Sequence, residues 1–342
     1  MSCDRCPEFR EKGAAFCPFC GERLGNPIVA VRAPRRKYDV FFIAGLIAAI
    51  QGMLMMFVEI LVGWSKLTYV LDGVAGSSYT LYYITPQIRD LVTVGDVGIM
   101  TIFVLELITV TACLGIMLYQ AMRKVRENYG DVRVIENTAA YEMPITLGLL
   151  LLAELAFMFL MIIAGVKLDG GGNTDMTPSL VFSLLHASVY EEILCRLLML
   201  GLPCLIVALL LKRKDSPWWR YLFGGMKFEW WMVFFILFSA VMFGAAHLTN
   251  WGTWKFIPTF AFGLMAGYLY VKYGLHACIG AHFINDYLVS SDWAIGAPGF
   301  FMVGMIAVGL CSLPYLGRYY LRIRDAYRSY CVKKESEIRE AD

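Results

Sequence analysis

Long apolar segments are the feature that most constrains how this chain can fold. They lie near 39–64, 98–120, 143–166, 179–211, 230–248, 255–273, 275–291 and 297–317. A helix needs about 20 predominantly apolar residues to cross the hydrocarbon core of a bilayer. Composition agrees, since 58% of the residues are hydrophobic and only 17% are charged, whereas soluble domains are about 25% charged. The sequence therefore predicts an all-α, polytopic membrane helix bundle of about eight transmembrane helices over residues 38–317.

The fourth apolar segment is longer than one crossing requires. It contains Gly201 and Pro203, and proline removes a backbone donor and bends a helix. We therefore expect a kink, or a short helix that continues after a break, near these two residues.

Basic residues are concentrated in alternate connections between the apolar segments. They precede the first segment and follow the second, fourth and eighth, for example at Arg35, Arg123 and Arg318, whereas connections 65–97 and 167–178 hold few Lys or Arg. Cytoplasmic loops of membrane proteins carry an excess of Lys and Arg. This pattern predicts a protein integral to the cell membrane with both termini in the cytoplasm, which requires an even number of crossings.

The flanking segments and the net charge indicate which partners to expect. Residues 25–37 mix Pro, Gly and basic residues without apolar periodicity, which is typical of a flexible basic linker. Residues 318–342 carry alternating charges and form a predicted cytoplasmic tail. The net charge of +2 is too small to indicate a nucleic-acid partner. The lipid bilayer is thus the first expected partner.

Four of the ten cysteines form two pairs at the amino terminus, Cys3-x-x-Cys6 and Cys17-x-x-Cys20. Two such knuckles offer four thiolates at the spacing of a tetrahedral zinc site. A segment as short as 1–24 cannot fold on a core, so metal binding would supply its folding energy. Two disulfides are the alternative, which a reducing cytoplasm disfavours. We predict a structural zinc ribbon over residues 1–24, with no open ligand position, that could dock a protein partner.

Ionisable side chains are grouped into motifs in three of the apolar segments. These residues are Glu191, Glu192 and Arg196 in the fourth segment, His247 in the fifth, and His282 and Asp286 in the seventh. An ionisable group at bilayer depth costs several kcal/mol unless it is paired or hydrated. We therefore expect these side chains to meet in one polar site inside the membrane.

Helical spacing predicts the pairing of these side chains. Glu192 and Arg196 lie four residues apart on one helix face and can form an ion pair. Glu191 is rotated by about 100° and remains available for another partner. His282 and Asp286 also share a face, as a metal-ligand pair or as a base with its orienting carboxylate. A purely structural ion pair is the alternative for Glu192.

Other buried polar residues match no motif. His186 and His276 are expected to be core histidines with satisfied hydrogen bonds. Glu59, Glu106 and Glu154 lie inside apolar segments, so they are expected to bond to neighbouring helices or to line water.

The three motifs together resemble a known family. Glu191-Glu192-x-x-x-Arg196, Phe243-x-x-x-His247 and His282-x-x-x-Asp286 follow the order and spacing of the CPBP family. This family contains CAAX prenyl protease, Abi and bacteriocin-processing-type intramembrane proteases. The similarity covers about residues 143–317 and implies an endopeptidase that cleaves a membrane-associated protein or peptide by Glu-assisted water attack.

The resemblance also implies roles for the site residues. Glu191 would activate the water, and Glu192 would be held by Arg196. His247 would bind the water or a metal, while His282 and Asp286 would stabilise the oxyanion or complete a ligand set. A catalytic divalent metal remains an open alternative, as does a prenylated CAAX tail for the substrate.

Two other functions remain open. One is a proton- or cation-coupled transporter that uses the carboxylates inside the apolar segments, although no internal repeat is visible in the sequence. The other is a silent protein that keeps the family fold as a binding or immunity module.

Overall fold

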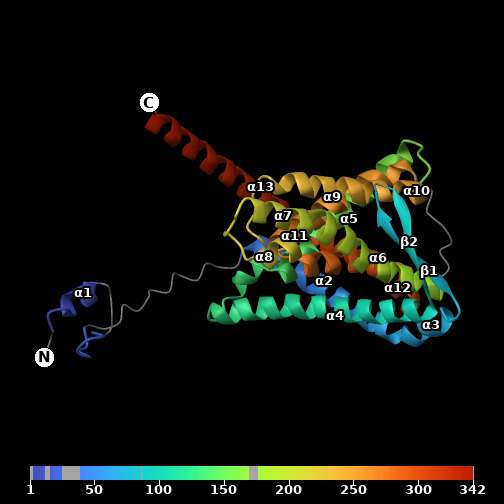
Figure 1. The fold of residues 1–342 in the computed structure, drawn as a ribbon, viewed down its shortest axis with the longest axis horizontal. Coiled ribbons are helices and arrows are strands. Elements are labelled where there is room, and N and C mark those ends of the chain that lie inside the picture. Colours follow the sequence, from blue (N-terminus) through green and yellow to red (C-terminus); the bar gives the residue numbers. More distant parts are fainter. Residues whose placement is uncertain (1–2, 12–15, 25–38, 86, 169–175, 342) are drawn as a thin grey trace. The chain divides into compact units, whose positions relative to one another are not determined.

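The computed structural model describes residues 3–11, 16–24, 39–85, 87–168 and 176–341 (Figure 1). The chain divides into two compact units, Met1–Asp39 and Val40–Asp342. The first unit contains helix α1 (Cys6–Glu11) and an isolated antiparallel bridge between Phe16 and Arg23. The predicted linker 25–37 lies outside the described residues.

The second unit is a helix bundle with one β-hairpin. Its elements in chain order are α2 (Val40–Ser65), α3 (Leu67–Gly73), β1 (Ser78–Ile84), β2 (Ile88–Gly95), α4 (Asp96–Glu127), η1 (Val132–Asn137), α5 (Ala139–Ile163), α6 (Pro178–Glu192), η2 (Ile193–Gly201), α7 (Leu202–Leu210), α8 (Trp218–Phe223), α9 (Met232–Ala246), α10 (Leu248–Trp251), η3 (Thr253–Lys255), α11 (Phe256–Lys272), α12 (Leu275–Ile295) and α13 (Phe300–Ala341). The prediction of an all-α polytopic bundle is confirmed, and α13 continues as one helix to Ala341, through the described part of the predicted tail 318–342.

Six helices in the described part of the chain are long and apolar enough to cross a membrane, rather than about eight. They are Val40–Ser65, Asp96–Glu127, Ala139–Ile163, Pro178–Leu210, Met232–Trp251 and Phe300–Leu321. The other two predicted segments form α11 and α12. Helix α11 has 17 residues, fewer than the roughly 20 that a crossing needs. Helix α12 has 21 residues but carries His282, Asp286 and Asp292.

The surroundings of α12 explain why it tolerates these polar residues. It packs against α2, α4, α5, α6, α11 and α13, so neighbouring helices surround it. Small residues permit the close packing: a Cβ on Gly280 would lie 3.0 to 3.5 Å from the methyl groups of Met117, Met56 and Met143. Polar side chains on a surrounded helix meet other helices instead of lipid.

The long fourth segment changes its winding instead of breaking. Residues Pro178–Leu210 form a continuous helical span of 33 residues. Between α6 and α7, residues Ile193–Gly201 adopt the wider π-helical turn, and Pro203 falls in the first turn of α7. The helical span thus continues through Gly201 and Pro203 without a break, and the predicted kink at these residues stays a prediction. The π-helix begins directly after Glu192, and π-helical turns inside α-helices occur often at functional sites.

A β-hairpin occupies the connection 65–97, where the sequence analysis expected only a loop. Strands β1 and β2 pair antiparallel from Ser78↔Gly95 to Ile84↔Ile88, with an irregularity between Leu81 and Tyr82. Aromatic and β-branched residues fill both strands, as strand propensity favours. Figure 1 shows the hairpin at the same end of the bundle as α3 and α10.

Helices α5 and α13 approach closely at a pair of glycines, which generates a stability prediction. A Cβ on Gly148 would lie 2.8 Å from the backbone nitrogen of Gly309. Gly148→Ala should therefore lower the free energy of unfolding by about 1–3 kcal/mol, because the helices must separate. Thermal unfolding in detergent measures the change. Gly115→Ala on α4, where nothing lies within 4 Å, is the control, and equal melting temperatures for the two variants would contradict the close approach.

Candidate functional site

The two consecutive glutamates of the first motif end helix α6. Glu192 and Arg196 are completely buried, and the Arg196 Nε lies 3.2 Å from Glu192 Oε2, as the four-residue spacing predicted. The Arg196 guanidinium also lies 4.7 Å from the centre of the Phe243 ring. The charge of Glu192 is thus compensated inside the bundle by a cation from the next helical turn.

His282 of α12 connects the first and third motifs. Its Nδ1 lies 2.9 Å from Glu192 Oε1, and its Nε2 lies 3.2 Å from Asp286 Oδ2. Carboxylates therefore flank both ring nitrogens, an arrangement that suits a ring with a proton on each nitrogen. The predicted contact between His282 and Asp286 on one face of the helix is present.

His247 brings the second motif to the same place. It follows the last residue of α9, and its Nδ1 lies 2.8 Å from the carbonyl oxygen of Phe243, four residues earlier. This contact leaves Nε2 facing Glu191. Glu191 Oε2 is 4.0 Å from the Nε2 of His247 and also 4.0 Å from the Nε2 of His282. The structure thus brings the six predicted site residues together from three segments of the chain.

The spacing around Glu191 Oε2 suits a bridging water. A separation of 4.0 Å is too long for a direct hydrogen bond, and a water molecule can bond to both sides of such a gap. Two ligands of one zinc-like cation, each about 2.0–2.1 Å from the ion, would lie about 3.3 Å apart. The observed distances therefore fit a water better than a directly bound metal ion.

A small polar cavity adjoins these groups. It has a volume of about 60 Å³, and its lining includes His247, His282, Asp286, Glu154 and Lys255. A space of this volume can accommodate about two water molecules. Glu154 was expected to line water or to bond to a neighbouring helix, and here it lines the cavity.

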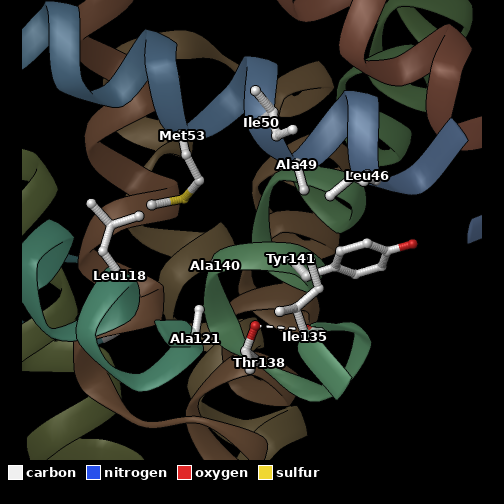
Figure 2. A pocket seen from close by; sticks show the side chains of 10 residues that line it. All are labelled: Leu46, Ala49, Ile50, Met53, Leu118, Ala121, Ile135, Thr138, Ala140 and Tyr141. Atoms are coloured by element: carbon white, nitrogen blue, oxygen red, sulfur yellow. Dashed lines mark hydrogen bonds between the residues drawn. The ribbon is translucent and has the colours of Figure 1, made fainter. Parts of the chain in front are cut away.

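A larger cavity elsewhere in the bundle has different chemistry. Figure 2 shows its lining by residues of α2, α4, η1 and α5, such as Met53, Leu118 and Tyr141. Its volume is about 250 Å³, but it is almost entirely apolar and shares no residue with the three motifs. Hydrolysis needs groups that move protons and stabilise charge. We therefore place the site at the smaller, polar cavity.

The contact of Tyr82 with the site was not predicted from the sequence. This residue of β1 donates a hydrogen bond from its hydroxyl to Glu191 Oε1 over 2.9 Å. Tyrosines at positions 79, 82 and 83 indicate a strand. They do not indicate which helix the strand contacts, because that contact joins residues 109 positions apart.

Some of the other buried polar residues form pairs, and others have polar atoms without a direct hydrogen-bond partner. His186 Nδ1 lies 2.7 Å from Glu106 Oε1, so these two form a buried pair between α6 and α4, whereas His186 Nε2 has no hydrogen-bond partner among the described residues. Neither carboxylate oxygen of Glu59 has a direct hydrogen-bond partner among the described residues, and the same holds for His276 Nε2.

The four amino-terminal cysteines cluster in the first unit. Their sulfur atoms all lie within 4.8 Å of one another, and the four thiols are not bridged by disulfides. Gly21 adopts a left-handed conformation with φ 74°, which lets its N–H reach the carbonyl of Cys17. Backbone N–H groups of Glu22 and Cys3 lower the pKa of the Cys20 thiol to about 6. The cluster could hold a metal ion, for which thiolates are the ligands.

The buried ion pair generates a second stability prediction. Arg196→Leu leaves Glu192 without its cation and should cost about 3–5 kcal/mol of stability, measured as a lower melting temperature in detergent. Arg123→Leu is the matched control, because Arg123 pairs with Glu127 at the same spacing on a surface where both are more than half exposed. That change should cost under about 1 kcal/mol. Equal losses in the two variants would contradict the role of burial.

Comparison with known families identifies the segment that carries the motifs. Residues 173–288 match the family model described as type II CAAX prenyl endopeptidase Rce1-like. The match lies inside the predicted core 143–317 and contains all three motifs. No curated protein and no solved structure matches the chain. The family model confirms the resemblance read from the motifs: residues 173–288 of this integral membrane protein are similar to the Rce1-like CAAX-type proteases.

Proposed function

We propose that this protein is an intramembrane-site endopeptidase that cleaves a peptide bond of a membrane-associated protein or peptide by water attack. The observation that carries the proposal is the position of Glu191 Oε2, 4.0 Å from the Nε2 atoms of both His247 and His282, beside the polar cavity. A water there can lie within hydrogen-bond reach of a carboxylate base and of two imidazole groups.

Glu191 is the group best placed to activate this water. Glu192 has both carboxylate oxygens engaged, one with His282 and the other with Arg196. Glu191 keeps Oε2 free to accept a proton as the water oxygen attacks the peptide carbonyl carbon. The tetrahedral intermediate then breaks its C–N bond, and the departing nitrogen takes up the proton. The products are a new carboxyl group and a new amine.

The histidines are placed to stabilise the negative charge that forms on the carbonyl oxygen. His247 presents Nε2 toward the cavity, since Nδ1 is bonded to the Phe243 carbonyl. Asp286 contacts His282, and its other oxygen accepts a hydrogen bond from Asn285 Nδ2 over 3.0 Å. Asp286 therefore orients His282 and does not itself donate to an oxyanion. If a divalent metal takes part, Glu191 and His247 would hold it, since both ring nitrogens of His282 already contact carboxylates, and it would polarise the carbonyl as a Lewis acid.

The membrane environment limits the substrate class. A site built from bundle helices takes a substrate that is itself held at the membrane, and a prenylated CAAX tail is one candidate. The distribution of Lys and Arg supports a cytoplasmic location of both termini.

A transporter is less well supported than a peptidase. Of the other carboxylates that it would use, Glu106 is bonded to His186 and does not line the polar cavity. A silent binding module would keep the same geometry, so only an activity measurement separates it from an enzyme.

Glu191→Gln tests the proposed base. Protein reconstituted in vesicles would be given a farnesylated peptide with a carboxy-terminal CAAX sequence, and the same peptide without the lipid. Wild-type protein should cleave at least one peptide, and Glu191→Gln should reduce kcat about 10²–10⁴-fold, because a general base contributes about that much. Mass spectrometry of the fragments measures the rate.

Glu127→Gln is the control for this change, since Glu127 is an exposed surface residue, and it should leave the rate unaltered. Cleavage of neither peptide by wild-type protein would contradict the proposed peptidase. Full activity of a folded Glu191→Gln variant would contradict the assignment of the base.

We also propose that the cysteine cluster is a structural zinc ribbon that serves as a docking module. The four sulfur atoms provide a complete tetrahedral ligand set with no position left for a substrate. A role away from the membrane site is supported by the separate compact unit in which the cluster lies.

Metal analysis tests the ribbon. Purified reduced protein should hold about one zinc per chain, and Cys17→Ser should release it, because a three-thiolate site binds more weakly. Elemental analysis by mass spectrometry measures the ratio. Cys113→Ser, which changes a buried thiol outside the cluster, should retain the zinc. Metal-free wild-type protein would contradict the ribbon.

A further inference from the structure

The β-hairpin supplies a contact to the site from outside the segment that matches the family. We propose that Tyr82 is a positioning residue that holds the water-activating carboxylate of Glu191 in its working orientation. This inference rests on the proposed function of Glu191 as the base, and it extends the site to residues 78–84, which precede the matched segment 173–288.

Two hydrogen bonds clamp β1 to consecutive residues of α6. The Tyr82 hydroxyl donates to Glu191 Oε1 over 2.9 Å, and the Tyr190 hydroxyl donates to the Tyr82 carbonyl over 2.7 Å. The rings of Tyr82 and Tyr190 meet edge to face with centres 5.4 Å apart. Each tyrosine therefore limits the movement of the other, and the Tyr82 hydroxyl is held beside the carboxylate of Glu191.

The same face of α6 anchors the hairpin one and two turns earlier. Phe182, His186 and Tyr190 stack along this face, with ring centres 5.3 and 4.7 Å apart. Tyr79 of β1 packs edge-on against Phe182 and His186 at 5.1 and 5.2 Å. His186 is in turn fixed by its 2.7 Å contact with Glu106 of α4. The proposed reaction does not use the buried Glu106–His186 pair. This pair thus stabilises the row of aromatic rings against which β1 packs.

The two carboxylate oxygens of Glu191 contact different partners. Oε1 accepts from Tyr82, and Oε2 faces His247 and His282. A glutamate side chain has three rotatable bonds, so an unbound Oε1 would let the carboxylate turn away from the histidines. A tyrosine phenol is protonated at neutral pH, so the Tyr82 hydroxyl is a donor to Glu191. Tyr82 therefore acts through Glu191 and does not touch the reacting atoms.

Tyr82→Phe tests this role with the two peptides described above. It removes the donor and keeps the ring, so kcat should fall about 10- to 100-fold, since a small misplacement of a catalytic group has this effect. KM should change less than about twofold, because the Tyr82 hydroxyl is engaged with Glu191 and the change should act on the chemical step. Tyr83→Phe is the matched control: the neighbouring side chain points to the opposite face of β1 and is 41% exposed. It should leave both constants unchanged.

A rescue experiment separates the hydrogen bond from general packing. Para-aminophenylalanine at position 82 retains a donor at the end of the ring and should restore most of the lost kcat. Should Tyr82→Phe fail to fold, Tyr190→Phe carries the same test, because it frees the Tyr82 carbonyl and should lower kcat in the same direction. A folded variant of either kind with wild-type kcat would overturn the role of Tyr82.

Thermal unfolding of a double-mutant cycle examines the contact without using activity. The losses of melting temperature in Tyr82→Phe and Glu191→Gln should not add in the double variant, because the first change removes the donor of this bond and the second removes the charge of its acceptor. Additive losses would overturn the contact. Wild-type protein that cleaves neither peptide would overturn the proposed function and this role with it. Wild-type cleavage with an unimpaired Tyr82→Phe variant would overturn the role alone.

Discussion

The high free-energy cost of a charge inside an apolar bundle is the constraint on which the arrangement of this protein depends. The buried charge of Glu192 is compensated by two partners, Arg196 in the following helical turn and His282 on α12. His282 in turn contacts Asp286. Because each group compensates the next, removing one leaves a buried charge unpaired. These contacts therefore fix the positions of the helices relative to one another. The orientation of Glu191, which precedes Glu192, depends on these helix positions.

Helix α12 shows how the bundle accommodates this chain of charges. A helix with four acidic or imidazole side chains is poorly suited to lipid, and here six other helices surround it. The surrounding helices carry most of the apolar surface, and α11 is shorter than a full crossing. The polar cavity forms where α11 and α12 meet the end of α9, and at this point the chain provides both water-binding groups and space.

Contacts within each motif were predicted from the sequence, whereas contacts between a motif and distant elements of the fold were not. The i, i+4 pairs Glu192/Arg196 and His282/Asp286 were predictable, since helical geometry alone places such residues together. Convergence of the three motifs was predicted from the cost of isolated charges and from family resemblance. The hairpin, the π-helical turn and the contact of Tyr82 were not predicted. About eight membrane-crossing helices were predicted, and six in the described part of the chain are long and apolar enough to cross, α11 and α12 being the two that fall short of that criterion.

Sequence by itself determined the helical bundle, the paired residues of each motif and the cysteine cluster, because these depend on local periodicity and on spacing of a few residues. Only the tertiary structure decided which oxygen of Glu191 faces the histidines and which accepts from Tyr82. That choice joins β1, α6, α9 and α12, which are up to 200 residues apart in the chain. No local pattern encodes such a contact, since it results from how whole elements pack around the buried charges.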